Sequence, residues 1–144
     1  MLPAVQAHFR AARGTCAWVV GSGWPLAAFP EAGPTSAMLD EVFDDRPAVF
    51  FDAFGHNAWL SSRALKLAKI DKTTPDPSQG VIVRDIGTGI PTGTLRDSAV
   101  SSVLSILPAE EDEDRYSDLL AGIREANKFG ITAFIDPGVT EQGL

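Results

Sequence analysis

The stretch Ala48-Val49-Phe50-Phe51-Asp52-Ala53-Phe54 is an almost continuous run of apolar, β-prone residues. Such a run is typical of a strand that is covered on both faces, as in a sheet with packed helices. Asp44-Asp45-Arg46-Pro47 precedes the run and Gly55 follows it, so residues that break regular structure bound it on both sides. The sequence therefore predicts a buried strand over 48–54 and a fold of the α/β class.

In the residues before the central strand, the sequence predicts a helix, then a second strand, then a second helix. Residues 37–43 favour a helix that begins at Thr35 or Ser36 and turns Leu39, Val42 and Phe43 inward. Residues 16–20 are β-rich and lead into a glycine-containing loop over 21–25. Good helix formers over 3–12 follow Pro3, which is favoured in a first helical turn.

The chain after this strand predicts a turn, helices and a hairpin. A turn is expected over 55–60, and Ser61 or Ser62 can cap a helix near 63–68. Residues 81–85 and 92–95 can pair as a β-hairpin. Helical periodicity recurs over 98–107 and 116–129, with Gly130 at the second end, and 131–135 favour a last strand. These elements predict a single small mixed α/β domain over 1–144.

The charge of the chain excludes some classes of partner. The 144 residues carry 19 acidic and 12 basic side chains, which gives a net charge of −7. An acidic chain lacks the positive surface that nucleic acid or an anionic membrane requires. Its apolar runs are far shorter than the roughly 20 residues that cross a bilayer, and the N-terminus does not follow the pattern of a signal peptide. We therefore expect a cytoplasmic protein that binds neither nucleic acid nor membrane.

Two side chains are candidates for substrate binding, His56 and Asp136. His56 follows the predicted central strand by two residues, where α/β folds present loops to ligands, although a purely structural role is the more common one. Asp136 directly follows the predicted last strand, where capping of the turn is the more common role. His8 and the single Cys16 have no partner of catalytic type nearby, and no Cys/His cluster has zinc spacing. We expect no catalytic residue and no metal ligand in this chain.

Several segments, taken in order, resemble one region of the metal-dependent amidohydrolase superfamily, in the branch of the N-substituted formamide deformylases. The segments that carry the resemblance are Trp18-Val19-Val20-Gly21-Ser22-Gly23-Trp24, Pro34-Thr35 with Leu39-Asp40, Arg46-Pro47, Gly55-His56-Asn57-Ala58-Trp59 with Ser62-Arg63-Ala64-Leu65, Thr74-Pro75-Asp76-Pro77 with Gly80, Arg84-Asp85, Gly89 to Leu95, and Asn127 with Gly130-Ile131-Thr132 and Asp136. They span about 15–138 of this chain. The sequence departs from the pattern at Ser61, where the family has asparagine, and at Asp97, where it has glutamate.

The resemblance implies that the chain is an internal piece of a (β/α)8 barrel enzyme and not a complete barrel. Residues 15–130 resemble the α/β insertion after the first barrel strand, and 131–144 resemble the segment of the next barrel strand. The divalent metal of the family, expected to be zinc, would be held by residues outside this chain. The roles of Asn57, Ser61, Arg84 and Asp97 stay open.

Two functions remain in competition at this point. In the first, the chain is a fragment or truncated relative of a hydrolase of non-peptide carbon–nitrogen bonds, inactive alone, with His56 beside the cavity for an amide substrate. In the second, it is a non-catalytic α/β module for association or small-molecule binding. In both, we expect a homodimer, because the predicted strand over 131–135 and the apolar stripes of the helices over 98–107 and 116–129 would otherwise be uncovered.

Overall fold

The computed structural model describes residues 10–11, 18–109, 111–133 and 135. The chain divides into two compact units, Met1–Pro108 and Ala109–Leu144. Among the described residues, the first unit holds a β-sheet with its helices, and the second holds a long helix.

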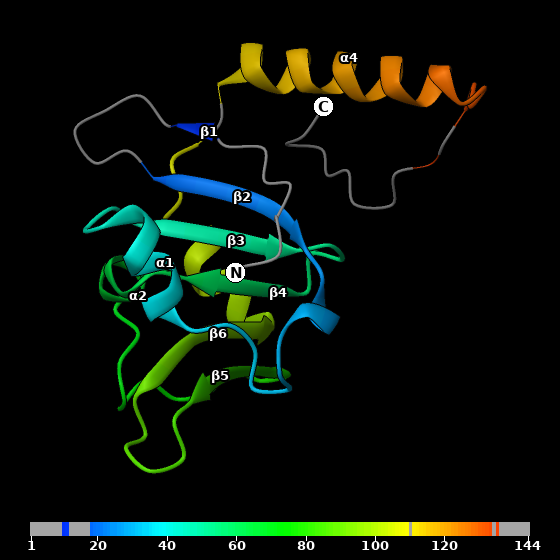
Figure 1. Ribbon diagram of the computed structural model, residues 1–144. Helices are drawn as coiled ribbons and strands as arrows, with labels where there is room; N and C mark the ends of the chain where they lie inside the picture. The colour runs from blue at the N-terminus through cyan, green and yellow to red at the C-terminus, as the bar shows by residue number, and fades with distance from the viewer. Residues whose placement is uncertain (1–9, 12–17, 110, 134, 136–144) are drawn as a thin grey trace. The chain divides into compact units, whose positions relative to one another are not determined.

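Within the described part of the first unit, six strands form one sheet in the order β1-β2-β3-β4-β6-β5 (Figure 1). The strands are β1 (Arg10–Ala11), β2 (Val19–Trp24), β3 (Ala48–Asp52), β4 (Asn57–Leu60), β5 (Gly80–Arg84) and β6 (Pro91–Asp97). Strands β2 and β3 are parallel, and the chain between them contains the 3-10 helix η1 (Leu26–Ala28) and the helix α1 (Ser36–Phe43). All other neighbouring strands in this sheet are antiparallel. The sheet is therefore mixed, as expected for a small mixed α/β domain.

The two faces of the sheet carry separate apolar clusters, because successive side chains of a strand point to opposite faces. Val49 belongs to a cluster with residues of α2 (Ser62–Leu67), η2 (Ser98–Val100) and α3 (Ser101–Leu104). The next residue, Phe50, belongs to a cluster on the other face with Trp24, Trp59 and Leu39 of α1. The predicted central strand is thus confirmed over 48–52, and it is covered on both faces.

Several predicted elements are confirmed in outline. The helices at α1 and α2 and the hairpin of β5 and β6 lie where they were expected. Ser61 is the residue that caps α2, since its Oγ accepts a hydrogen bond from the Ala64 N–H at 3.2 Å. The helix expected over 98–107 is shorter, as η2 and α3 together end at Leu104.

Other predictions were wrong because tertiary pairing overrides local propensity. Residues 57–60, expected in a turn, form strand β4 between β3 and β6. Arg10–Ala11, expected in a helix, pair with β2 as strand β1, and the rest of the predicted helix over 3–12 lies outside the described residues. Strand β2 continues through the glycines that were expected to form a loop. Val42 is 57% exposed and does not face the core.

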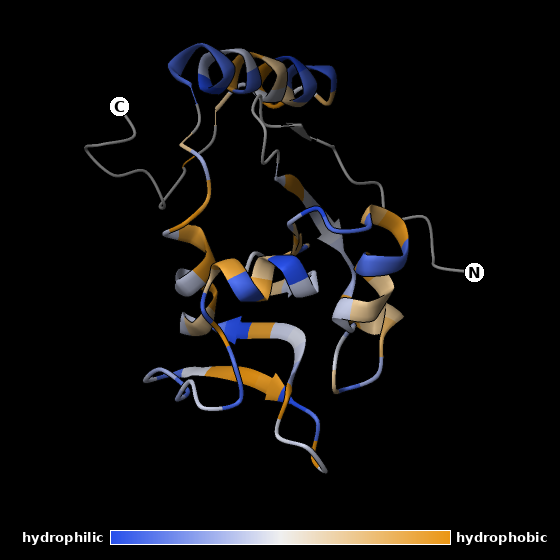
Figure 2. Ribbon diagram, turned by 90° about the vertical axis from the view of Figure 1, so that its left-hand side faces the viewer, coloured by the Kyte–Doolittle hydropathy of each residue, from blue (hydrophilic) through white to orange (hydrophobic). Residues whose placement is uncertain are grey.

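The second unit contains α4 (Asp112–Lys128), which is longer than the helix predicted over 116–129. Its first turn carries Asp112, Glu113 and Asp114, and none of its described side chains is buried. Gly130 ends it with φ of +74°. Figure 2 shows both hydrophilic and hydrophobic residues along this helix. No helix within the described residues is long and apolar enough to span a membrane.

The prediction of a strand over 131–135 was wrong for the residues that the structure describes in that range. Residues 131–133 and 135 are not part of any strand. Ile131 is 47% exposed and Ile135 is 93% exposed. Apolar, β-branched residues favour a strand only where a neighbouring strand offers a ladder of hydrogen bonds and a buried face. None of the described strands pairs with this segment.

Candidate functional site

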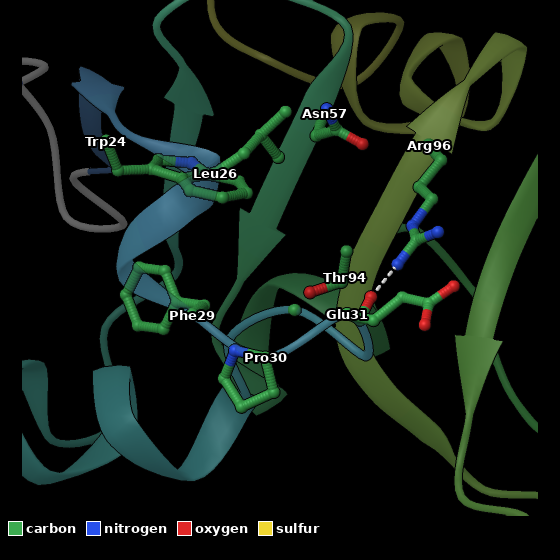
Figure 3. Close-up of a pocket in the computed structure, with 9 residues that line it drawn as sticks. Trp24, Leu26, Phe29, Pro30, Glu31, Asn57, Thr94 and Arg96 are labelled. Atoms are coloured by element: carbon green, nitrogen blue, oxygen red, sulfur yellow. Dashed lines mark hydrogen bonds between the residues drawn. The ribbon is translucent and has the colours of Figure 1, made fainter.

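A pocket of about 250 Å³ lies in the first unit, beside strands β4 and β6 (Figure 3). The chain between β2 and α1 forms one wall, and residues of β4 and β6 form the other. Its lining residues are Trp24, Leu26, Phe29, Pro30, Glu31, Gly33, Asn57, Thr94 and Arg96. This volume is below the roughly 300–1,000 Å³ of pockets that hold drug-sized ligands, so a small molecule would fill it.

The wall between β2 and α1 is anchored to the sheet by hydrogen bonds. Thr94 Oγ1 donates to the Pro34 carbonyl at 2.7 Å, and Trp59 Nε1 donates to the Thr35 carbonyl at 2.7 Å. The Arg96 guanidinium donates to the Glu31 carbonyl, as the dashed line in Figure 3 marks. Gly33 permits the close approach, because a Cβ there would lie 2.6 Å from Thr94 Oγ1. Contacts within the protein therefore hold this wall of the pocket in place.

Contacts between aromatic rings fix the side chains that form the apolar side of the pocket. The rings of Trp24 and Phe29 meet edge to face with centroids 5.6 Å apart, and Phe29 meets Trp59 in the same way at 5.4 Å. Trp24 Nε1 donates to the Phe50 carbonyl at 2.9 Å, which satisfies the one polar group of this buried ring. Leu26 is 48% exposed and also lines the pocket.

Asn57 forms the polar floor of the pocket at the turn between β3 and β4, and the buried Asp52 holds it there. Asp52 is 3% exposed and Asn57 is 9% exposed. Asp52 Oδ1 accepts from the Asn57 backbone N–H at 2.9 Å, and Asp52 Oδ2 accepts from Asn57 Nδ2 at 3.0 Å. The carboxylate thereby fixes the orientation of the Asn57 carboxamide, whose oxygen lies on the side of Arg96 in Figure 3.

The structure places His56 at an exposed position in the β3–β4 turn, next to Asn57. Its backbone carbonyl accepts a hydrogen bond from the Asp97 N–H at 2.7 Å. His56 is not among the residues that line the pocket, although its neighbour Asn57 is. Asp136, His8 and Cys16 lie outside the described residues.

The other residues whose roles were open have structural contacts. Ser61 Oγ, besides capping α2, accepts from the Ala48 N–H at 2.9 Å and donates to the Arg46 carbonyl at 3.2 Å. Arg84 forms an ion pair with Asp76 at 2.5 Å. Asp97 has φ of +50° where β6 passes into η2.

The pKa values of three carboxyl groups in the β5–β6 region and the loop before it are lowered. Hydrogen bonds from the Thr73 side chain and the Arg84 side chain are the main causes of the lowered pKa for Asp71 and Asp76, respectively. A hydrogen bond from the Thr88 side chain is the main cause of the lowered pKa of Asp85 in the hairpin loop. None of these groups lines the pocket, so their pKa shifts reflect local turn and hairpin structure.

The described residues do not suit a metal ion. No three His, Cys, Asp or Glu side chains among them come together in a group that could hold one. The buried carboxylate of Asp52 is already bonded to Asn57 through both oxygens. The chemistry that the pocket residues offer is hydrogen bonding and apolar contact with a small molecule.

Sequence reasoning missed most of the pocket. It singled out His56 but not Trp24, Leu26 or Phe29, which come from a Pro- and Gly-rich stretch without periodicity. Arg96 also carried no local signal, because its role depends on the approach of a segment 65 residues away in the sequence. One usable signal was Asp52, a charged residue within an apolar run, since such a residue requires a specific partner when it is buried.

Comparison with known proteins identifies relatives over most of the chain. The profile of the Amidohydrolase family matches residues 2–143. The putative amidohydrolase YtcJ of Bacillus subtilis (strain 168) is 35% identical over 116 residues, which are 80% of this chain and 22% of that protein. The N-substituted formamide deformylase of Arthrobacter pascens is 36% identical over 128 residues, which are 85% of this chain and 23% of that protein.

A solved structure is also similar to part of the fold. An uncharacterised metal-dependent hydrolase from Pyrococcus horikoshii OT3 matches 80% of this chain and 21% of its own, with a TM-score of 0.48 and 18% identity. The chain spans between a fifth and a quarter of the length of these relatives. Because the family profile covers nearly every residue, the chain belongs to the Amidohydrolase family.

Proposed function

We propose that this chain is a segment of a metal-dependent hydrolase that cleaves non-peptide carbon–nitrogen bonds in amides or formamides. The observation that carries the proposal is the family match over residues 2–143. The similarity to a relative named for formamide deformylation supports the choice of bond. No observation of comparable weight favours the alternative of a non-catalytic α/β module.

In this proposal the chain contributes substrate positioning, and the metal, expected to be zinc, is held by residues outside this chain. The chain's coverage of only 22–23% of the two curated relatives supports this division of roles, because most of each relative lies outside the matched region. His56, exposed in the turn beside the pocket floor, and Asp136 remain the proposed substrate-contacting residues. The chain alone is then inactive.

A chimeric enzyme tests the proposed function. The segment of the Arthrobacter pascens deformylase that aligns with this chain is replaced by the present sequence, and formate release from an N-substituted formamide is measured. We expect measurable hydrolysis that depends on the metal, and a reduced rate when His56 is changed to glutamine. A chimera that is folded and metal-loaded but releases no formate would contradict the proposal.

The inactivity of the isolated chain needs a separate measurement. The purified chain is incubated with Zn²⁺, dialysed, and assayed for bound zinc and for formate release. We expect neither stoichiometric zinc nor hydrolysis. Bound zinc together with turnover would show that the chain has its own metal centre.

A further inference from the structure

We propose that the ion pair of Asp76 and Arg84 closes the outer edge of strand β5 and so prevents a second copy of the chain from extending the sheet by strand pairing. We call these two residues the edge pair. Neither of them lines the pocket, so this role is independent of the proposed function.

Strand β5 is the last strand at one end of the described sheet, with β6 on one side and no described strand on the other (Figure 1). The open side of an edge strand carries backbone N–H and C=O groups that can pair with another chain. Its central residues, Val81-Ile82-Val83, are apolar and β-branched, and such residues favour strand pairing. Without protection, β5 would therefore favour the addition of a further strand.

The edge pair occupies both backbone groups of Ile82 at the middle of β5. Ile82 N–H donates to Asp76 Oδ1 at 3.2 Å, and Ile82 C=O accepts from Arg84 Nη1 at 2.8 Å. In an antiparallel ladder a residue directs its N–H and its C=O to the same side, and successive residues alternate between the two sides. Because neither of these bonds goes to β6, the two groups of Ile82 are those of the open edge.

The Arg84 side chain is held in place at three acceptors. One guanidinium nitrogen contacts Asp76 Oδ1 at 2.5 Å as well as the Ile82 carbonyl, and another donates to the Thr74 carbonyl. The planar guanidinium has several donors in a fixed arrangement, which suits it to join a strand to a neighbouring segment. Arg84 thereby ties the segment before β5 to the edge of the strand.

That segment covers the edge without presenting a strand of its own. Gly80 lies two residues before Ile82, and its N–H donates to the Pro77 carbonyl at 3.1 Å. Pro75 and Pro77 have no backbone N–H, and proline is one of the residues that keep sheet edges from pairing. The cover therefore replaces the open edge with a segment that is a poor template for another strand.

A second copy of the chain is the partner that the uncovered edge would accept. Two identical strands that pair antiparallel about a twofold axis are self-complementary. The Ile82 N–H of each copy can then donate to the Ile82 C=O of the other, as in a hydrogen-bonded pair of an antiparallel ladder. These are the same two groups that the edge pair occupies, so the pair and a second copy compete for them.

Sedimentation velocity of the full chain and its variants tests the competition. The double variant Asp76→Ala/Arg84→Ala should associate about tenfold more tightly than the unmodified chain, since each copy gains backbone hydrogen bonds. Each single variant uncovers one group and should have a smaller effect. The pair is partly exposed, so the variants should fold, and circular dichroism verifies this.

Asp85→Ala is the matched control for Asp76→Ala. Both substitutions remove one exposed carboxylate and change the net charge equally. Asp85 accepts its hydrogen bonds within the hairpin loop, from Gly87 and Thr88, so its loss loosens the loop and leaves the edge pair intact. We expect the Asp85→Ala chain to associate no more than the unmodified one. Equal association of the two variants would mean that lost charge or lost stability is the cause.

Hydrogen exchange of the Ile82 amide, followed by nuclear magnetic resonance, locates the association. In the unmodified chain the exchange should be slow at every protein concentration, because Asp76 accepts from this N–H. In the Asp76→Ala chain it should be fast in dilute solution and slow again where the chain associates. Exchange that stays slow in the dilute variant, association that leaves the Ile82 amide unprotected, or variants that associate no more than the unmodified chain would each overturn the inference.

Discussion

At the scale of single residues, Asp52 holds Asn57 in place at the pocket floor. A carboxylate at the end of an apolar strand is costly to bury unless hydrogen-bond donors meet both of its oxygens. The backbone and side chain of Asn57 provide those donors at 2.9 and 3.0 Å. Asp52 thus closes the β3–β4 turn and orients the carboxamide that faces the pocket.

We predict that Asp52→Ala destabilises the fold by about 1–3 kcal/mol, because the buried Asn57 N–H groups lose their acceptors. Urea unfolding followed by tryptophan fluorescence measures the change. The control is Asp45→Ala in the exposed turn before β3, which should change stability by less than about 0.5 kcal/mol. Equal effects of the two substitutions would contradict the role given to Asp52.

A second prediction concerns Asp76 and pH. The hydrogen bond from the Arg84 side chain, aided by the Ile82 N–H, holds the pKa of Asp76 below its ordinary value of 3.8. A carboxyl group with a lowered folded-state pKa stabilises the fold above its unfolded-state pKa, and the contribution disappears as pH falls through the folded-state value. Asp76→Asn should therefore reduce stability at neutral pH and have less effect in acid.

Unfolding free energies at about pH 7 and about pH 3 test this expectation. The control is the same substitution in an Arg84→Gln background, where the main cause of the lowered pKa is already absent. If Asp76→Asn costs the same at both pH values in the unmodified chain, the ion pair at 2.5 Å does not stabilise the fold. The pair is partly exposed, so its contribution is small.

Among the elements, the contact of β6 with α1 depends on Gly93. Its φ is +118°, and a Cβ there would lie 2.4 Å from Ser36 Oγ and 2.5 Å from the Ser36 backbone nitrogen. Strand β6 therefore approaches the first turn of α1 more closely than any side chain would allow. This contact places the chain before α1 over Thr94, where it forms the wall of the pocket.

We predict that Gly93→Ala is more destabilising than Gly55→Ala. Both glycines have positive φ, so both substitutions carry a conformational cost of about 1–2 kcal/mol. A Cβ added at Gly55 would have no atom within 4 Å, whereas one at Gly93 meets the helix and should cost about 1–3 kcal/mol more. Thermal unfolding measures both variants, and similar melting temperatures would show that α1 can move away at no cost.

In the molecule as a whole, α4 exposes apolar side chains and carries acidic residues in its first turn. Tyr116 is 64% exposed and Leu119 is 55% exposed. The first turn carries three carboxylates, of which Asp112 pairs with Arg115. Near the other end lie Arg124 and Lys128, and Lys128 pairs with Glu125. Two copies of α4 packed antiparallel would bury both apolar stripes and bring each acidic end to a basic end, with their helix dipoles opposed.

We predict that the chain forms a weak homodimer through α4. An interface of one helix per chain is small, so the dissociation constant should be no tighter than about micromolar. Sedimentation velocity of the full chain measures association, and Leu119→Lys should abolish it. Leu104→Lys, on a leucine of nearly equal exposure in α3, is the control and should leave it intact. A monomeric unmodified chain at high concentration would refute the prediction.

Local sequence was sufficient to predict the mixed α/β class, the buried strand over 48–52, the helices α1 and α2, and the β5–β6 hairpin. These elements depend on short-range information: apolar runs, capping residues such as Ser61, and turn residues around the hairpin. Ordered motifs along the chain also sufficed to indicate the family. Each of these signals acts over a few residues and needs no knowledge of distant neighbours.

The remaining features depend on tertiary structure. Residues 57–60 form strand β4 because β3 and β6 offer hydrogen bonds on both sides, whereas 131–133 and 135, which also favour a strand, have no such partner among the described strands. The pocket joins a loop over 24–33 to Asn57 and to β6, and Arg96 reaches Glu31 across 65 positions of sequence. Contacts of that separation depend on the pairing of the whole sheet, which no local pattern encodes.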